Sequence, residues 1–334
     1  MPDLSLRPPM HEENANVGKR IDLANATAPG KVILFGEHAV VYGRPAIAVP
    51  VTKVQATAAV AAAATGSGCT ISAPDIGVRI RLPSAPDNPL ALAVRLALQA
   101  AGVHAEPDWN ISVSSTIPIA GGMGSGAAVS AVLARAVLAS APTFHGCPDA
   151  ETVNRIVYAV ERIHHATPSG IDNTVVVYEQ PVWFVRGRPP EIFDIAKPFH
   201  LVIADTGIAS PTGQVVADVR AARQEDAARY DAIFDAIGAI AEQARRIIAS
   251  GKLETLGFLM RENQRLLRQL YVSAPSLERL IETAEDAGAA GAKLSGAGRG
   301  GNLIAVVERK KIGLVREALL AKGAARAIVT QVGR

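Results

Sequence analysis

Apolar residues form short runs in the first quarter of the chain, and glycine, proline or polar residues separate them. Runs of this length, with turn residues at their ends, predict β-strands. They lie at residues 31–35, 46–51, 54–62, 69–73 and 78–82. The chain is therefore predicted to begin with a strand-rich region.

Longer stretches with apolar residues at helical spacing follow. Helices are predicted at residues 89–101, 126–140, 149–165 and 310–322, and in a helix-rich stretch over 211–287 that Gly251 and residues 273–275 interrupt. Further strands are predicted at residues 173–178, 182–186, 201–204, 302–307 and 326–330. The break from Gly187 to Pro190 predicts a domain boundary near residue 187.

Strands concentrated early and helices concentrated later predict an α+β fold. At 334 residues the chain is long enough for two domains. We expect a flexible N-terminal tail over residues 1–25, an N-terminal domain over 26–187 and a C-terminal domain over 188–334.

Composition narrows the class of protein. Hydrophobic residues make up 49% of the chain and charged residues 19%, which is typical of a globular protein. A net charge of +3 gives no basic footprint for nucleic acid. No run has the length of a membrane span, and the polar N-terminus lacks a signal peptide. Cys69 and Cys147 have no paired spacing, which favours a reduced, cytoplasmic protein. Together these features lead us to expect no membrane or nucleic-acid partner.

Residues 117–128, with the sequence Ile-Pro-Ile-Ala-Gly-Gly-Met-Gly-Ser-Gly-Ala-Ala, are the most informative segment. A β-type run at 109–115 precedes them, and an amphipathic run follows. Glycines allow close approach of the backbone to a ligand, and a helix start offers free N–H groups at a positive dipole end. The segment therefore predicts an anion site, and phosphate is the anion that we expect. The alternative is a flexible turn before a buried helix.

A second glycine cluster, Ser-Gly-Ala-Gly-Arg-Gly-Gly, covers residues 295–301. It satisfies the spacing G-x-G-x-x-G, but we expect a helix before it and a strand after it. A dinucleotide-binding fold requires the opposite order. Neither cluster ends in the Gly-Lys-Ser/Thr of a Walker loop. A tight turn is the simpler alternative for this cluster.

Two further segments carry titratable groups. Residues 29–38 place Lys31 and the pair Glu37 and His38 at opposite ends of a predicted strand; in isolation, Glu37 and His38 would more often be surface residues. Residues 164–173 place Asp172 in a predicted loop between a helix and a strand, where a capping role is the alternative. Glu161 lies four residues before His165, but a zinc site of Glu161, His164 and His165 lacks the usual spacing.

These four segments, in this order, resemble the GHMP kinases, the small-molecule kinases named for galactose, homoserine, mevalonate and phosphomevalonate. The central loop is similar to that family's phosphate loop, and residues 295–301 are similar to its third motif. The segments 29–38, 165–173 and 205–207 are most similar to those of the branch that phosphorylates mevalonate. The resemblance implies a two-domain α+β fold with the active site in the inter-domain cleft. It also implies ATP and Mg²⁺, and transfer of phosphate to the 5-hydroxyl of mevalonate in isoprenoid precursor synthesis.

The resemblance also implies roles for individual residues. Asp172 and Lys31 would be catalytic, and Glu161 and Ser125 would bind the metal. The nucleotide would be held by Pro118, Gly121, Gly122, Gly124, Ser125, Gly126 and Ala127. The substrate would be held by Glu37, His38, Ser169, Asp172, Thr206 and Gly298.

Three positions depart from the family pattern. Gly126 stands where a second serine is usual, Met123 replaces a leucine, and Arg299 replaces a glycine of the third motif. Arg299 could reach a phosphate or the substrate carboxylate, or point to solvent. The alternatives are another GHMP enzyme (a phosphomevalonate kinase, a mevalonate 3-kinase or a decarboxylase-like enzyme) or a silent ligand-binding regulator. The sequence does not decide between a monomer and a homodimer.

Overall fold

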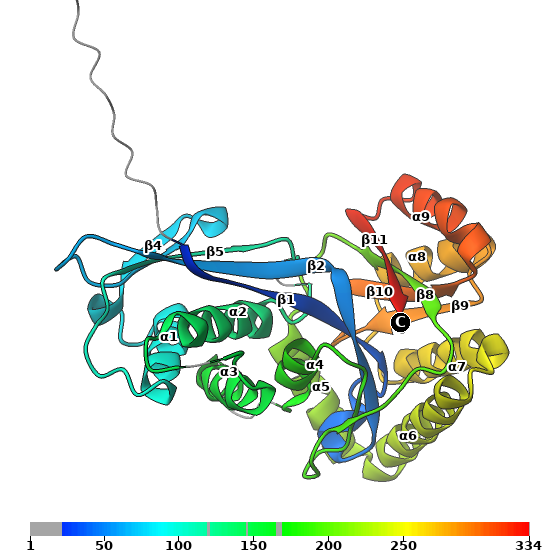
Figure 1. Ribbon diagram of the computed structural model, residues 1–334. Coiled ribbons are helices and arrows are strands. Elements are labelled where there is room, and N and C mark those ends of the chain that lie inside the picture. Colours follow the sequence, from blue (N-terminus) through cyan, green and yellow to red (C-terminus); the bar gives the residue numbers. More distant parts are fainter. Residues whose placement is uncertain (1–21, 119–120, 145, 165–168, 334) are drawn as a thin grey trace, which may run out of the picture.

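The computed structural model describes residues 22–118, 121–144, 146–164 and 169–333. Two β-sheets, each covered by helices, form the two halves of the molecule (Figure 1). This is the α+β architecture that the distribution of strands and helices predicts.

The first sheet has the strand order β4-β3-β5-β2-β6-β7, and β1 pairs with β2 outside this path. Its strands are β1 (Asp22–Phe35), β2 (Ala46–Ala62), β3 (Thr70–Ala73), β4 (Val78–Arg81), β5 (Trp109–Ser115), β6 (Val182–Phe184) and β7 (Glu191–Ile192). The runs at 46–51 and 54–62 are one strand, because a register shift at Pro29/Gly30 of β1 accommodates the residues between them. β1 begins at Asp22, so residues 22–25 of the predicted tail pair with β2 instead.

One face of this sheet is covered by helices (Figure 1). They are α1 (Pro89–Ala100), α2 (Ser125–Ser140), α3 (Ala150–His164) and α4 (Ile171–Tyr178). The first three were predicted from their periodicity, and those predictions are confirmed. Small and branched apolar side chains fill the space between helices and sheet, and α2 is buried on nearly all sides.

The prediction of a strand at 173–178 is wrong, because these residues belong to α4. The run Asn-Thr-Val-Val-Val-Tyr is rich in β-branched residues, which favour strands. A short apolar run cannot be assigned to a buried strand or a buried helix by periodicity alone. Here Gly170 adopts a left-handed conformation at the N-cap and starts a helix whose residues from Asn173 to Val177 are buried.

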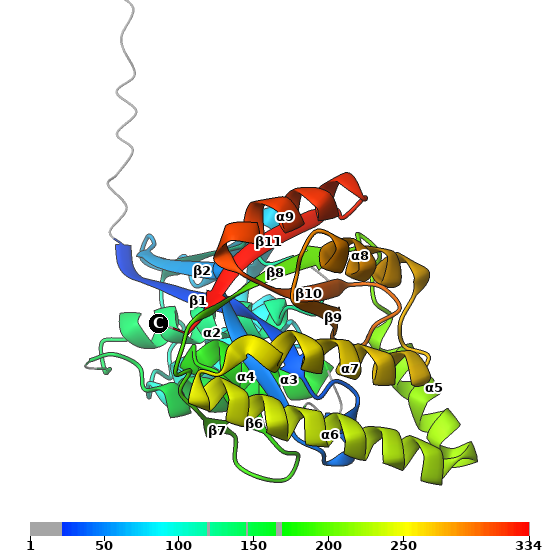
Figure 2. The same cartoon turned by 90° about the vertical axis from the view of Figure 1, so that its right-hand side faces the viewer.

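The second sheet is antiparallel, with the order β11-β8-β10-β9 (Figure 2). Its strands are β8 (Phe199–Asp205), β9 (Gly291–Ser295), β10 (Asn302–Val307) and β11 (Arg326–Val332). Its helices are α5 (Thr212–Glu225), α6 (Ala227–Ser250), α7 (Leu256–Gln269), α8 (Pro275–Asp286) and α9 (Ile312–Ala321). The sequence did not predict β9, so the second glycine cluster follows a strand rather than a helix and closes a β-hairpin.

The two halves pack closely. Phe199 and Leu201 of β8 belong to the same buried cluster as Phe35 of the first sheet. β7 lies beyond the predicted boundary near 187 but pairs with β6, and the next strand belongs to the second sheet. We therefore propose that the domain junction lies between Ile192 and Phe199. Among the described residues, no helix has the length and apolar character needed to cross a bilayer.

Candidate active site

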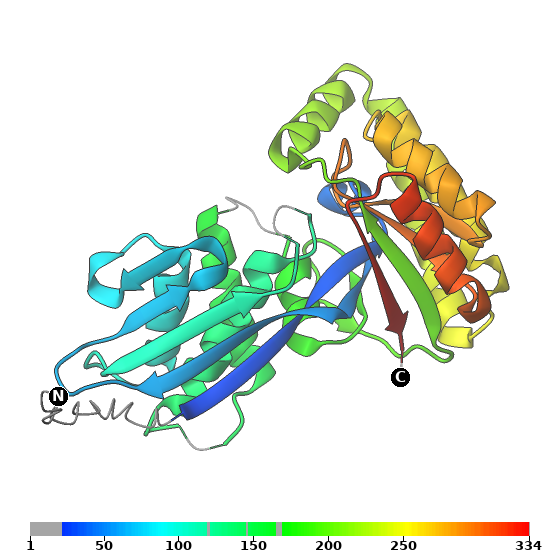
Figure 3. The same cartoon turned by 90° about the horizontal axis from the view of Figure 1, so that it is seen from above.

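A cleft of about 470 Å³ lies between the two halves of the molecule. β1 and β2 extend from the first half toward the second, and the end of β1 lies beside the second half (Figure 3). The first half contributes Lys31, Ile33, Glu37, His38, Val40, Val41, Pro118, Gly122, Met123, Gly124, Ser125, Gly126, Ala127, Glu161, Ser169, Ile171 and Asp172 to the cleft wall. The second half contributes Ser210, Thr212, Val216, Gly296 and Ala297. Most of the predicted site residues therefore meet in one cleft.

The glycine loop enters α2 at Gly124, which has a φ of +72° and no side-chain cap. The N–H groups of a first helical turn have no partner within the helix and favour an anion. A Cβ atom on Gly124 would lie 2.9 Å from Cγ of Lys31, so the close packing of lysine against the loop requires glycine. The backbone N–H of Lys31 also donates to the Met123 carbonyl at 2.9 Å. The loop therefore fixes the position of Lys31.

Lys31 and Asp172 form an ion pair with a distance of 2.9 Å between Nζ and Oδ1. The lysine side chain is 5% exposed and the aspartate 33%, so the carboxylate remains accessible from the cleft. Asp172 lies in the first turn of α4, not in the loop that the sequence predicted. A lysine beside a carboxylate neutralises its charge while leaving a second oxygen able to accept a proton or a hydrogen bond.

Glu161 of α3 lines the same cleft beside the start of α2. A Cβ atom on Gly126 would lie 3.5 Å from Oε1 of Glu161, so the loop position that lacks a serine faces this carboxylate. Carboxylate and hydroxyl oxygens such as those of Glu161 and Ser125 are the ligands that Mg²⁺ prefers. Within the described residues, no group of three or more His, Cys, Asp or Glu side chains could hold a metal. Phosphate oxygens and water would therefore have to complete the ligand shell of a cation bound here.

Glu37 is fully buried and forms an ion pair with Lys293 of β9, which is also fully buried. The Lys293 ammonium donates to the Leu294 carbonyl as well, at 2.7 Å. Oε2 of Glu37 has no hydrogen-bond partner among the described residues. Burial raises the pKa of Glu37 and lowers the pKa of Lys293, and the attraction within the pair opposes both shifts. The pair holds one wall of the cleft and connects the two halves.

His38 precedes a short 3-10 helix, η1 (Ala39–Tyr42), and has a φ of +61°. Its Nε2 lies 2.8 Å from the Ala297 carbonyl, which can only accept, so this nitrogen carries a proton. Burial lowers the pKa of His38, which favours the neutral ring. The ring therefore retains Nδ1 as a hydrogen-bond acceptor.

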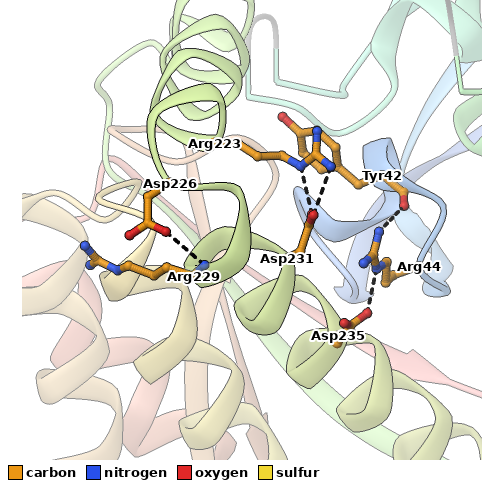
Figure 4. Close-up of polar contacts among 7 residues, drawn as sticks. All are labelled: Tyr42, Arg44, Arg223, Asp226, Arg229, Asp231 and Asp235. Carbon is orange, nitrogen blue, oxygen red and sulfur yellow. Dashed lines mark hydrogen bonds and ion pairs between the residues drawn. The ribbon is translucent and has the colours of Figure 1, made fainter.

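η1 is anchored to α6 of the second half (Figure 4). The ring of Tyr42 stacks on that of Phe234 with centroids 4.3 Å apart. Arg44 donates to Asp235 at 2.8 Å and to the Tyr42 carbonyl. These contacts hold the segment that carries Glu37 and His38 against the second half of the molecule.

Three predicted site residues are not among the described residues of the cleft wall. The Gly121 carbonyl accepts a hydrogen bond from the Asn302 amide. The Thr206 hydroxyl donates to the Gly301 carbonyl at 2.9 Å. Gly298 packs against the Val272 carbonyl, where a Cβ atom would be only 2.1 Å from the oxygen. Each supports a loop beside the cleft in the structure.

Sequence reasoning placed Thr206 and Gly298 of the second half in the site, but it missed other residues of that half. Thr212 and Val216 of α5, and Ser210 just before this helix, line the cleft, and Lys293 holds Glu37. The dipeptide Pro211-Thr212 before a helical pattern was a signal for a helix start. No local signal placed Lys293 beside Glu37, because the two lie 256 residues apart. His165, part of the zinc alternative, lies outside the described residues.

A glycine loop at a helix start, a lysine–aspartate pair and a separate carboxylate in one cleft define a phosphoryl-transfer site. The comparisons with known proteins agree with this class. The chain belongs to the GHMP kinase family: residues 89–180 match the GHMP kinases N terminal domain, and residues 236–325 match the GHMP kinases C terminal family.

Several relatives have specific names. A mevalonate kinase of Thermococcus sibiricus is 32% identical over 327 residues, covering 92% of this chain and 96% of the relative. A mevalonate kinase of Aeropyrum pernix is 34% identical over 299 residues, covering 86% and 90%. The crystal structure of L. major mevalonate kinase in complex with R-mevalonate is similar with a TM-score of 0.81 and 28% identity, covering 95% and 98%.

Proposed function

We propose that this protein transfers the γ-phosphoryl group of ATP to the 5-hydroxyl of mevalonate, giving 5-phosphomevalonate and ADP. The main support is the Lys31–Asp172 pair, which lies in the same cleft as the phosphate loop. The relatives named mevalonate kinase support the choice of acceptor. We also propose that it acts in the cytoplasm as part of isoprenoid precursor synthesis.

Phosphoryl transfer depends mainly on positioning and on neutralisation of charge. The backbone N–H groups at the start of α2 bind the phosphates of ATP. The second carboxylate oxygen of Asp172 accepts a hydrogen bond from the attacking hydroxyl, orients it, and takes its proton as the new P–O bond forms and the bond to ADP breaks. The Lys31 ammonium stabilises negative charge on the transferring group. Ile33, Val40 and Val216 give the cleft an apolar wall that excludes water from the reaction.

We further propose that Glu161 and Ser125 hold Mg²⁺ together with phosphate oxygens and water. The fit rests on their oxygen donors, which line one cleft beside the phosphate loop. When bound, Mg²⁺ neutralises charge on the phosphate oxygens. The side chains and backbone of the protein then have to orient the mevalonate hydroxyl and the γ-phosphoryl group of ATP.

Glu161→Gln is expected to raise the Mg²⁺ concentration that gives half-maximal rate, because one anionic ligand is lost. The measurement is a Mg²⁺ titration of activity at saturating ATP and mevalonate. Glu151→Gln is the matched control, since Glu151 lies in the first turn of the same helix and outside the described cleft wall. A titration of Glu161→Gln that overlays the parent would remove Glu161 from the metal site.

The loop serine and the neighbouring glycine give a second test of the metal site. Ser125→Ala is expected to weaken the use of Mg²⁺ at limiting concentration. Gly126→Ser is expected to be mild or beneficial, because a Cβ atom fits there at ordinary contact distance from Glu161. The measurement compares both variants with the parent at limiting and saturating Mg²⁺. Parent-like behaviour of Ser125→Ala at limiting Mg²⁺ would mean that no loop hydroxyl serves as a ligand.

The function itself is tested by ADP release with mevalonate, phosphomevalonate, homoserine and galactose as acceptors. We expect turnover with mevalonate. The product identifies the hydroxyl, because a primary ester couples its phosphorus to two C5 protons in the ³¹P spectrum and a tertiary 3-ester does not. Turnover only with another acceptor would reassign the substrate. ATP binding without turnover of any acceptor would favour the silent regulator.

A further inference from the structure

Arg299 occupies the third glycine motif, between Gly298 and Gly300, and has a φ of +55°. This left-handed conformation is unfavourable for a residue with a side chain and natural for glycine. The backbone N–H of Arg299 donates to the Val272 carbonyl at 2.7 Å, which fixes the turn. An arginine side chain is thus present at a position where the backbone conformation favours glycine.

The Arg299 side chain is directed to α5, and it is not among the described residues that line the cleft. Its guanidinium forms an ion pair with Asp218 of α5, and Nε donates to the Tyr271 carbonyl at 3.3 Å. Asp218 also accepts a hydrogen bond from Gln214, one turn earlier in the helix, at 2.6 Å. The arginine therefore joins the glycine loop to the first half of α5.

α5 has few apolar contacts to hold it. Its buried residues are Val215 and Val219, and most of its other side chains are exposed. The helix lies at the edge of the molecule beside the start of α6 (Figure 2). Helices with little buried apolar surface open more readily than core elements. The position of α5 must therefore depend largely on polar contacts.

A second ion pair holds the other end of α5 (Figure 4). Arg223 donates to both carboxylate oxygens of Asp231 on α6, at 2.8 and 3.0 Å. The Arg223 guanidinium also lies over the ring of Tyr42, 5.1 Å from its centroid. The position of α5 thus depends on one pair in its middle and another in its last turn.

α5 contributes directly to the cleft through Thr212 and Val216. Val216 lies two residues before Asp218, so a shift at the ion pair moves this part of the wall. We propose that Arg299 is a positioning residue for the acceptor alcohol, which holds α5 through Asp218 and so sets the cleft wall formed by Thr212 and Val216. The inference rests on the proposed function for the identity of that alcohol.

The first test uses Arg299→Gly, because glycine suits the left-handed backbone and the loop keeps its conformation. We expect the KM for mevalonate to rise roughly three- to fivefold, on the scale of a half-exposed ion pair. The KM for ATP and the melting temperature should not change. Asp218→Asn should have the same effect, and the double variant should be no worse than either single variant. Arg299→Lys should raise the KM for mevalonate less than Arg299→Gly does, because lysine keeps the positive charge.

The control is Glu191→Gln, which breaks the exposed Arg245–Glu191 pair between α6 and β7 and should leave both KM values unchanged. Added salt should raise the mevalonate KM of the parent more than that of Arg299→Gly, because salt screens exposed charges. An unchanged mevalonate KM in Arg299→Gly and Asp218→Asn would overturn the inference. An equal rise in the KM for ATP would also overturn it and assign Arg299 to the nucleotide.

A second measurement does not depend on the identity of the substrate. Hydrogen exchange of the backbone amides of residues 212–225 should be faster in Arg299→Gly and Asp218→Asn than in the parent. Exchange in Glu191→Gln should match the parent over the same residues. If the parent does not phosphorylate mevalonate, the proposed function fails, and this measurement still decides whether Arg299 positions α5. Unchanged exchange in α5 would overturn the positioning role.

Discussion

Asp172→Asn is expected to lower kcat by roughly 10²–10⁴-fold, the usual contribution of a positioned proton acceptor. The asparagine side chain has the same shape but carries no charge, and its NH₂ group would face the attacking hydroxyl or Lys31. The affinity for ATP should stay close to that of the parent, because in the proposed function the start of α2 binds the phosphates. The measurement is single-turnover phosphoryl transfer together with direct titration of ATP binding.

The control must account for loss of a negative charge near a helix start, which alone costs stability. Asp149→Asn serves this purpose, since Asp149 accepts a hydrogen bond from the Thr152 N–H at the start of α3 and lies outside the described cleft wall. We expect it to retain the activity of the parent. A kcat for Asp172→Asn within about threefold of the parent, where a proton acceptor should contribute far more, would exclude Asp172 from the chemical step. Lys31 would then be the main stabilising group near the transferring phosphate.

The phosphate loop could be predicted from sequence because its signal is local. Glycines and a following helical pattern lie within one segment, and α2 begins at Ser125, one residue before the predicted start. The catalytic roles of Lys31 and Asp172 were inferred from family resemblance, and the structure places the two side chains in contact. Local patterns and family motifs therefore predicted which residues of the first half line this part of the cleft.

Other features could not be predicted because they depend on packing between distant segments. α4 is a helix although its β-branched residues favour a strand, because the surrounding core buries a helix at that position. β9 was missed because Lys293 interrupts its short apolar run. That lysine is buried only because Glu37, from the other half of the molecule, lies beside it. The Glu37–Lys293 pair thus explains why β9 could not be predicted from sequence, and it also supports the cleft wall.

Lys293→Met is expected to lower the free energy of unfolding by about 3–5 kcal/mol, because it leaves the Glu37 carboxylate buried without its cation. Glu37→Gln/Lys293→Met should recover much of this loss, since the buried charge is then absent. The measurement is urea-induced unfolding of each variant. Lys310→Met is the matched control, because Lys310 pairs with Glu308 at the surface and its side chain is 77% exposed. Exposed pairs contribute about 0–1 kcal/mol, so this control should change little.

The pH dependence separates loss of charge from loss of packing. Lys293 opposes the rise in the pKa of Glu37 that burial causes, so Lys293→Met should raise that pKa further. A carboxyl group with a raised pKa in the folded state contributes stability that is lost as the pH rises through that pKa. The deficit of Lys293→Met relative to the parent should therefore grow as the pH rises above the pKa that Glu37 has in the parent. In Glu37→Gln/Lys293→Met it should not grow, because no carboxylate remains to ionise. A deficit of Lys293→Met that is constant with pH would show that the lysine acts through packing of its chain, and that Glu37 does not depend on it for its charge.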